Sequence, residues 1–294
     1  MIHDPNQDSI AKAFASAGYI ADEGLLTAVV LMEVLTRPLL LEGEAGVGKT
    51  EVAKALAASK GTDLIRLQCF EGLDRSDALY EWNYQRQLLA IKAHEGHGDP
   101  DALESAIFSE KYLLQRPLLA AIRSERPVVL LIDEVDRADE EFEAFLLEVL
   151  SDYQVSIPEL GTIPAASIPR VVLTSNGTRE LSDALRRRCL YHYVDYPDVG
   201  REAEILRARV SGIDTAFALQ IAELMSRLRK EDLAKVPGVA ETIDWAAALA
   251  GLGGTHLARD RELVFDTLAC VLKTREDRSR ITREVTDRLI GKVA

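Results

Sequence analysis

The chain has 294 residues, of which 47% are hydrophobic, and a formal net charge of −13 at pH 7. This length allows one large domain or two smaller ones with a sizeable core. The acidic balance argues against the basic face with which proteins usually bind nucleic acid, so we expect no nucleic-acid partner. Charges such as Glu33 and Arg37 interrupt the longest apolar runs, which argues against a membrane span.

The cysteines and the first residues bear on the compartment. Cys69, Cys189 and Cys270 are odd in number and scattered, which favours reduced thiols over a disulfide framework. Residues 1–5 lack the basic start and the apolar stretch of a signal peptide. Both features predict a cytoplasmic protein.

In chain order, the first predicted elements are two helices over residues 9–17 and 22–35, separated at Gly18 and Tyr19. An apolar strand over 38–41 follows and leads into a glycine-rich loop. The loop has the spacing G-x-x-x-x-G-K-T, and a helical pattern over 51–58 comes after it. Its eight residues are Gly43, Glu44, Ala45, Gly46, Val47, Gly48, Lys49 and Thr50.

This succession of strand, loop and helix predicts a binding site for a nucleoside triphosphate. Glycines allow successive backbone N–H groups to surround an anion, and the start of the helix adds its positive dipole end. Lys49 would bind the β- and γ-phosphates, and the Thr50 hydroxyl would hold Mg²⁺. A chance glycine turn with a surface lysine is the weaker interpretation, because a strand and a helix flank the loop.

Four more apolar segments predict the other strands of a parallel sheet, at residues 64–69, 128–132, 170–174 and 191–194. We predict a helical insert at about 82–126 and a hairpin at about 153–163. From residue 197 onward the pattern is helical only. We therefore predict an α/β domain over 1–196 and a helical domain over 197–294.

The strand at 128–132 ends in Asp133 and Glu134, at the edge where α/β sheets bind ligands. Asp133 is the expected partner of Mg²⁺, and Glu134 would polarise the water that attacks the terminal phosphate. A pair of solvated acids at a strand end is the alternative, which the upstream glycine loop disfavours. An acid that activates water predicts hydrolysis rather than phosphate transfer to a small molecule.

Two further features follow the strand at 170–174. Asn176 would contact the γ-phosphate and orient the attacking water, whereas a plain Asn-Gly turn is the alternative. A short helix is expected after it, over 181–189, and it closes on three consecutive arginines. Ring-forming ATPases present an arginine at this place to the nucleotide of a neighbouring subunit, although a basic triplet is more often a solvated face.

The order of these motifs resembles that of the AAA+ ATPases, and residues 146–158 resemble the MoxR group within that family. Residues 41–51, 80–87 and 237–245 are similar to the CoxD-like branch. The resemblance covers nearly the whole chain. It implies an α/β fold: a P-loop AAA+ domain with a five-stranded parallel sheet between helices, followed by a smaller all-helical lid.

The resemblance also implies how ATP is bound. Residues 43–50 together with Glu51 would bind the nucleotide, with Thr50 and Asp133 serving Mg²⁺. Tyr19 and Ile20 fall where the family packs on the adenine, although a simple turn between helices explains them equally well.

Two further positions correspond to catalytic residues of the family. Asn176 would be the sensor-1 residue, and Arg188 aligns best with the arginine finger, with Arg187 as a close rival. Cys189 stands where relatives often carry Phe after that arginine. Many relatives carry a sensor-2 arginine in the lid, whereas residues 238–242 offer no basic side chain.

The resemblance implies partners as well: a homo-oligomeric ring of six subunits, a metalloenzyme client and a protein with a von Willebrand factor A domain. In the CoxD-like branch the client would be a molybdenum- and copper-containing carbon monoxide dehydrogenase or a similar enzyme. A DNA-remodelling motor remains an alternative, although the predicted hairpin carries Glu159 and no Lys or Arg. A nucleotide-gated switch with little turnover is the other alternative, which the missing sensor-2 arginine supports.

Overall fold

The computed structural model describes residues 5–94, 103 and 106–293, and the chain divides into two compact units. The sheet unit comprises Glu23–Glu42 and Leu56–His192. The helical unit comprises Met1–Asp22, Gly43–Ala55 and Tyr193–Ala294. The glycine loop and the N-terminal segment therefore group with the C-terminal helices. The division into domains at residue 196 stays a prediction.

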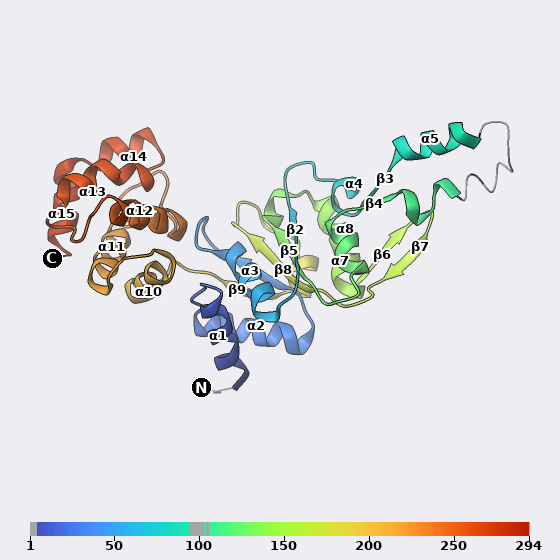
Figure 1. Ribbon diagram of the computed structural model, residues 1–294, viewed down its shortest axis with the longest axis horizontal. Helices are drawn as coiled ribbons and strands as arrows, with labels where there is room; N and C mark the ends of the chain where they lie inside the picture. The colour runs from blue at the N-terminus through green and yellow to red at the C-terminus, as the bar shows by residue number, and fades with distance from the viewer. Residues whose placement is uncertain (1–4, 95–102, 104–105, 294) are drawn as a thin grey trace. The chain divides into compact units, whose positions relative to one another are not determined.

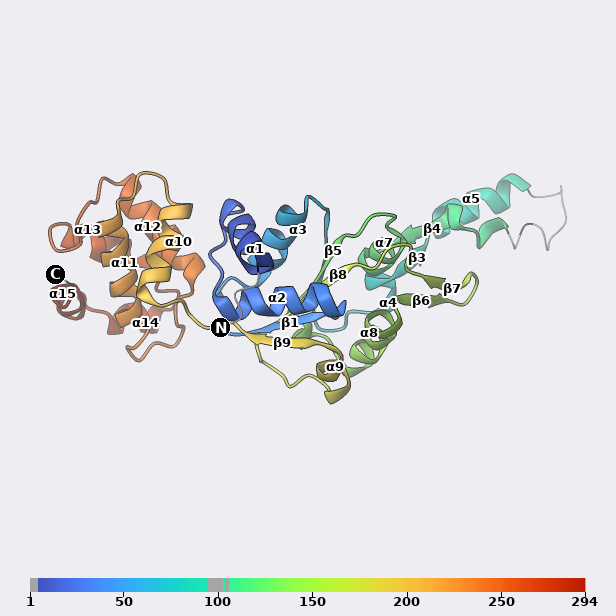
Figure 2. The ribbon, with the colours of Figure 1, turned by 90° about the horizontal axis from the view of Figure 1, so that it is seen from below.

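The sheet unit contains a five-stranded sheet with the strand order β2-β5-β8-β1-β9 (Figure 1). Its strands begin and end within one residue of the segments predicted from the apolar runs, which confirms the α/β fold class. They are β1 (Leu39–Glu42), β2 (Leu64–Gln68), β5 (Val129–Asp133), β8 (Arg170–Ser175) and β9 (Leu190–Tyr193). β9 is an edge strand beside β1 (Figure 2).

The register brings the ends of the central strands to one edge of the sheet. β2, β5, β8 and β1 pair in parallel, with Gln68 opposite Asp133 and Leu41 opposite Thr174. All five residues of β5 are buried, as expected for a strand covered on both faces. The polar residues that end these strands therefore lie next to one another.

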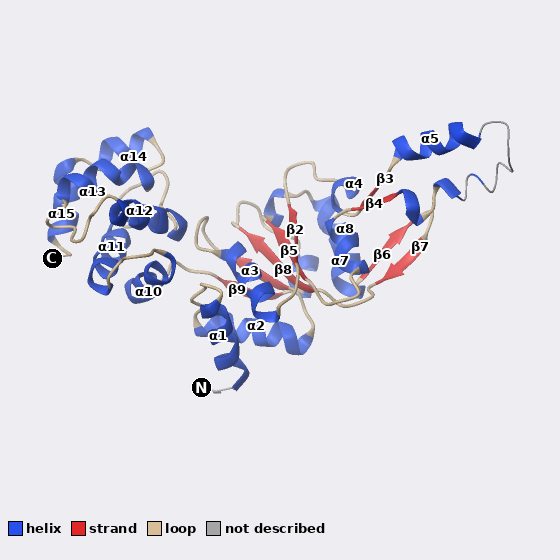
Figure 3. Ribbon diagram, in the orientation of Figure 1, coloured by secondary structure: helices blue, strands red, loops and turns tan. Residues whose placement is uncertain are grey.

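Helices cover the sheet, and strands and helices alternate along this part of the chain (Figure 3). Helix α8 (Glu140–Asp152) has a side-chain cap, since Asp139 accepts a hydrogen bond from Phe142 N at 2.8 Å. Among the described residues, the helices of this unit whose bounds are defined include α2 (Glu23–Leu35), α4 (Arg75–Ala78), α5 (Tyr84–His94), α7 (Pro117–Arg123), α8 (Glu140–Asp152) and α9 (Asp183–Arg188), with 3₁₀ turns η1 (Glu110–Tyr112) and η2 (Val135–Arg137).

The sheet unit also contains two small antiparallel sheets of two strands each. The hairpin expected at 153–163 corresponds to β6 (Gln154–Ile157) and β7 (Gly161–Pro164). The insert expected to be helical also contains a strand, β4 (Leu113–Gln115), which pairs with β3 (Tyr80–Trp82). Trp82 is buried and packs edge-on against Phe108, so tertiary contacts rather than local periodicity create this strand pair. Residues 95–102 and 104–105 of the insert lie outside the described residues.

The helical unit has its own hydrophobic core, built around the fully buried Trp245. A buried ion pair joins its elements: Arg229 donates to both carboxylate oxygens of Glu202 at 2.7 and 2.6 Å. The unit contains α1 (Pro5–Ser16), the start of α3 (Lys49–Lys60), α10 (Val199–Arg209), α11 (Thr215–Leu228), α12 (Val239–Gly251), α13 (Arg261–Thr267), η3 (Leu268–Cys270), α14 (Arg275–Arg280) and α15 (Arg283–Gly291).

Among residues 5–94, 103 and 106–293, no helix combines the length and the apolar character needed to cross a bilayer.

Candidate functional site

The glycine loop follows directly after β1 and ends where α3 begins at Lys49. Gly46 and Gly48 have φ values of 81° and 97°, a region that residues with a Cβ rarely adopt. The Lys49 side chain is buried and folds back along the loop, donating to the carbonyls of Gly43 at 2.6 Å and Glu44 at 2.7 Å. The ammonium group is therefore held beside the loop and next to the N-terminus of α3, where an anion is favoured.

Tyr19 lies beside the same loop. A Cβ at Gly48 would lie 3.8 Å from Tyr19 Cε2, so the ring and the loop are close neighbours. The ring also packs edge-on against Phe14 with centroids 5.9 Å apart, and burial raises the pKa of the Tyr19 hydroxyl. Its neighbour Ile20 accepts a hydrogen bond from Arg201 Nε at 3.1 Å. The structure thus brings together two parts of the predicted nucleotide site that are far apart in sequence.

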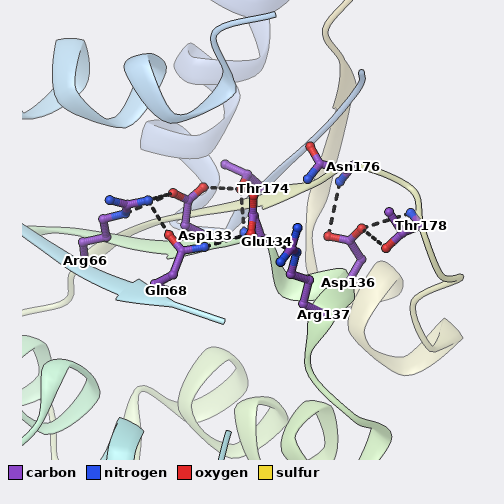
Figure 4. A network of polar contacts seen from close by, with 9 residues as sticks. All are labelled: Arg66, Gln68, Asp133, Glu134, Asp136, Arg137, Thr174, Asn176 and Thr178. Carbon is purple, nitrogen blue, oxygen red and sulfur yellow. Dashed lines mark hydrogen bonds and ion pairs between the residues drawn. The ribbon is translucent and has the colours of Figure 1, made fainter. Parts of the chain in front are cut away.

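The carboxylate of Asp133 is fixed from two sides (Figure 4). Thr174, on β8, donates its hydroxyl to Asp133 Oδ1 at 2.5 Å. Arg66, on β2, donates to Oδ2 from Nη2 at 2.5 Å and from Nε at 3.0 Å. The Asp133 side chain is almost completely buried, so its charge depends on these partners and on any further cation that binds there.

Glu134 leaves β5 in the left-handed region, with φ 56° and ψ 49°. Its N–H donates to the Thr174 hydroxyl oxygen at 2.9 Å, which supports this uncommon backbone conformation. The carboxylate oxygen Oε2 lies 3.0 Å from Gln68 Nε2 and 3.0 Å from Arg137 Nε. The Glu134 side chain is one-third exposed, so it is held in place and still open to solvent.

Asn176 is positioned through its backbone by Asp136. Asp136 is buried and accepts hydrogen bonds from Asn176 N at 3.2 Å, Thr178 N at 3.0 Å and the Thr178 hydroxyl at 2.6 Å (Figure 4). Burial acts to raise the pKa of Asp136, but these hydrogen bonds outweigh it and leave the pKa below its ordinary value. The Asn176 side chain therefore starts from a fixed backbone at the end of β8, two residues beyond Thr174.

The three arginines at the end of α9 have different surroundings, although all are exposed. Arg188 makes contacts within the chain: it donates to the Ser151 hydroxyl and to Ala184 O. Arg186 Nη2 lies 3.8 Å from Glu42 Oε2. Within the described part of the chain, the Arg187 side chain makes no hydrogen bond or ion pair, which leaves its guanidinium available for another molecule.

Cys69 lies beside the acids but has no reactive character. Its N–H donates to Asp133 O at 2.8 Å, and its side chain is buried. Burial, together with the nearby carboxylates Asp133, Asp136 and Glu134, raises the pKa of the Cys69 thiol to about 12. The thiol stays protonated at neutral pH and serves packing.

Sequence reasoning missed the residues that hold the acids: Arg66, Gln68, Asp136, Arg137 and Thr174. A signal for two of them was present, because Arg66 and Gln68 alternate with apolar residues on a strand and so share one face of the sheet. Residues Asp136 and Arg137 gave no such signal, since they lie in a 3₁₀ turn that apolar periodicity does not reveal.

Comparisons with known proteins assign the chain to a family. The family model of the AAA domain, dynein-related subfamily, matches residues 38–189. The gas vesicle ATPase GvpN of Haloferax mediterranei is 26% identical over 264 residues, which cover 87% of this chain and 74% of that protein. The chaperone protein ClpB 2 of Thermosynechococcus vestitus is 26% identical over 86% of this chain and 23% of that protein. A RuvB mutant of Thermotoga maritima gives a TM-score of 0.48 at 17% identity, covering 90% of this chain and 68% of that chain.

Proposed function

Because the chain belongs to the AAA domain family, in its dynein-related subfamily, we propose that it works as a ring-forming, chaperone-like ATPase on a protein client. As a member of that family it is an ATPase, which converts ATP and water to ADP and phosphate. The observation that carries the proposal is the pair of acids at the end of β5, each fixed by partners from neighbouring strands. A fixed acid next to a developing nucleophile is what hydrolysis requires beyond positioning and charge stabilisation.

The glycine loop binds the phosphates in this proposal. Residues 43–50 supply backbone N–H groups, Lys49 supplies positive charge, and Glu51 continues the first turn of α3. Tyr19 and Ile20 supply the surface for the adenine, which the closeness of Tyr19 to Gly48 supports.

Mg²⁺ fits the residues that the chain offers for it. Mg²⁺ prefers oxygen ligands, and the carboxylate of Asp133 and the hydroxyl of Thr50 are donors of that kind. When bound, the ion neutralises charge on the β- and γ-phosphate oxygens. Thr174 and Arg66 hold the Asp133 carboxylate in one orientation for this purpose.

The catalytic step depends on Glu134 and Asn176. Glu134 accepts a proton from the attacking water, while Gln68 and Arg137 keep its carboxylate in place. The Asn176 amide orients that water or the γ-phosphate from the end of β8. A neighbouring subunit completes the site with an arginine from α9, and the surroundings of Arg187 and Arg188 favour Arg187, because the side chain of Arg188 is bonded within its own subunit.

The client is proposed from resemblance to the MoxR group and its CoxD-like branch. It would be a metalloenzyme of the molybdenum- and copper-containing carbon monoxide dehydrogenase type, matured by a ring of six subunits together with a von Willebrand factor A-domain partner. The names of two relatives, an ATPase of gas vesicles and a chaperone, support a role in remodelling or assembling other proteins.

The experiment that tests this proposal measures ATP turnover per subunit from nanomolar to tens of micromolar protein. If a neighbour completes the site, turnover per subunit rises steeply with concentration. Arg187→Ala should then abolish the rise and lower the rate by about 10³-fold, as for other arginine fingers. Arg188→Ala is the matched control on the same helix, with a smaller loss expected. Glu134→Gln is the inactive reference, and we expect it to bind ATP without turnover.

The outcomes separate the alternatives. A flat, appreciable rate that neither arginine variant changes would refute the ring proposal. A larger loss in Arg188→Ala than in Arg187→Ala would reverse the assignment of the arginine. Tight ATP binding with negligible turnover at all concentrations would favour a nucleotide-gated switch.

A further inference from the structure

The start of helix α12 contacts the glycine loop through main-chain atoms. Gly46 O accepts a hydrogen bond from Val239 N at 2.8 Å, and Ala240 N lies 3.4 Å from the same oxygen. All of these residues belong to the helical unit. We propose that this contact positions the Gly46–Val47 peptide for phosphate binding, so that helix α12 sets nucleotide affinity through its backbone and needs no basic side chain. The proposal deepens the function proposed above and rests on it.

The geometry of a trans peptide explains how the contact acts. The C=O and the N–H of one trans peptide point in opposite directions, and the described chain contains no cis peptide. Because Gly46 O points toward α12, the N–H of Val47 points away from α12. Loops of this type bind phosphate through successive N–H groups on their inner side. The hydrogen bond from Val239 therefore orients one of the donors that the phosphate needs.

The start of α12 is itself firmly held, so it can act as a fixed support. Arg229, which forms the buried ion pair with Glu202, also donates to Pro237 O at 2.9 Å and to the Thr242 hydroxyl at 3.0 Å. Glu241 Oε2 accepts a hydrogen bond from Gly238 N at 3.1 Å, which completes the cap of the helix. The residues on both sides of Gly238 are thus tied to the core of the helical unit.

Gly238 permits the close approach of the two segments. A Cβ at this position would lie 2.7 Å from Gly46 Cα and 2.9 Å from both Gly46 C and Gly46 O. The backbone of Gly238, with φ −82° and ψ −179°, is one that alanine adopts without strain. Glycine is therefore required at position 238 because a Cβ would collide with the loop, and not because of the backbone conformation. Alanine at this position would disturb the contact between the helix and the loop without straining its own backbone.

The test compares Gly238→Ala with Gly251→Ala. Gly251 lies at the other end of the same helix, and a Cβ there would meet no atom within 4 Å. The dissociation constants for ADP, ATP and AMP are measured by competition with a fluorescent nucleotide, and amide exchange of residues 43–50 is followed by mass spectrometry. We expect Gly238→Ala to weaken ADP and ATP about tenfold or more, as for the loss of a hydrogen bond to a charged group. Exchange in the loop should increase.

AMP lacks the β-phosphate that the loop binds. Its affinity therefore distinguishes a change in the loop from a change that weakens nucleotide binding in general. If the substitution removes only a contact to that β-phosphate, the affinity for AMP should change by less than about twofold. Gly251→Ala should leave all three affinities unchanged.

Several results would overturn the inference. Unchanged ADP affinity in a folded Gly238→Ala protein would do so, and so would equal losses for AMP and ADP. If Gly238→Ala does not fold, Glu241→Ala removes the cap of Gly238 without adding volume, and it should weaken ADP while sparing AMP. A wild-type protein that binds neither ADP nor ATP would instead refute the proposed function itself.

Discussion

At the scale of single residues, the buried carboxylate of Asp136 positions the backbone of Asn176 at the candidate site. Three hydrogen bonds from residues after β8 reach its two oxygens, and they lower its pKa although burial acts in the other direction. A carboxylate whose pKa is lower in the folded protein stabilises the fold above its unfolded pKa. That contribution is lost as the pH falls through the folded pKa.

Asp136→Asn should therefore destabilise the protein by about 1–3 kcal/mol at pH 7, because it weakens hydrogen bonds to a buried group. The difference in free energy of unfolding between wild type and variant should shrink as the pH is lowered below about 4, near the pKa of an unfolded Asp. Urea denaturation at pH 7, 5, 4 and 3 measures it. A difference that stays constant with pH would show that the charge of Asp136 is not involved.

Some features of the candidate site could be predicted from the sequence, and others could not. Asp133, Glu134 and Asn176 each follow an apolar strand, so strand prediction placed them at one edge of the sheet. The contact of α12 with Gly46 could not be predicted, because main-chain atoms make it and any sequence has those atoms.

At the scale of elements, α9 depends on a residue far away in sequence. Arg37, just before β1, donates to Arg187 O at 2.5 Å, Arg188 O at 3.2 Å and Cys189 O at 3.3 Å. These carbonyls lie at the C-terminal end of α9, where a cation is favoured. One guanidinium thus fixes the end of the helix that carries the arginines.

We expect Arg37→Ala to lower turnover at least about tenfold without changing ATP affinity, because an arginine placed slightly wrongly loses much of its effect. The loss of stability should be about 1–3 kcal/mol. Steady-state kinetics, nucleotide binding and urea denaturation together test this. Arg126→Ala, an exposed arginine at another loop, is the control. Wild-type turnover in Arg37→Ala would mean that α9 needs no such cap.

The elements themselves were predictable to different degrees. The strands of the five-stranded sheet were predicted within a residue because apolar residues mark each of them, in continuous runs in β1 and β5 and alternating with polar residues in β2. β3 and β4 were not predicted, since each has three residues and is defined by its partner in the strand pair and by Trp82 packing on Phe108. Short strands of this kind depend on contacts between distant residues, which a local pattern does not encode.

At the scale of the whole molecule, the two hydrophobic cores have no residue in common. The chain has two tryptophans, and each core contains one: Trp82 in the sheet unit and Trp245 in the helical unit. Chains with separate cores often depart from a single cooperative transition.

Two variants with one tryptophan each should therefore report two different unfolding midpoints in urea. Trp245→Phe leaves Trp82 as the probe of the sheet unit, and Trp82→Phe leaves Trp245 as the probe of the helical unit. Tryptophan fluorescence measures both, with circular dichroism of each variant as a check that the substitution has not itself shifted the transition. Coincident midpoints by all probes would show that the two cores unfold as one.

The Thr174 hydroxyl restricts which substitutions evolution can accept at this position. This single oxygen donates to Asp133 and accepts from the N–H of Glu134, and Thr174 is almost completely buried. Serine keeps both bonds at the cost of one methyl group, whereas valine has the same shape and keeps neither. Of the accessible replacements, only serine is expected to survive selection here, although the apolar positions before it on β8 can exchange among valine, isoleucine and leucine. Among homologous sequences, a hydroxyl residue at the fifth position of β8 should therefore be conserved more strongly than most of the residues around it.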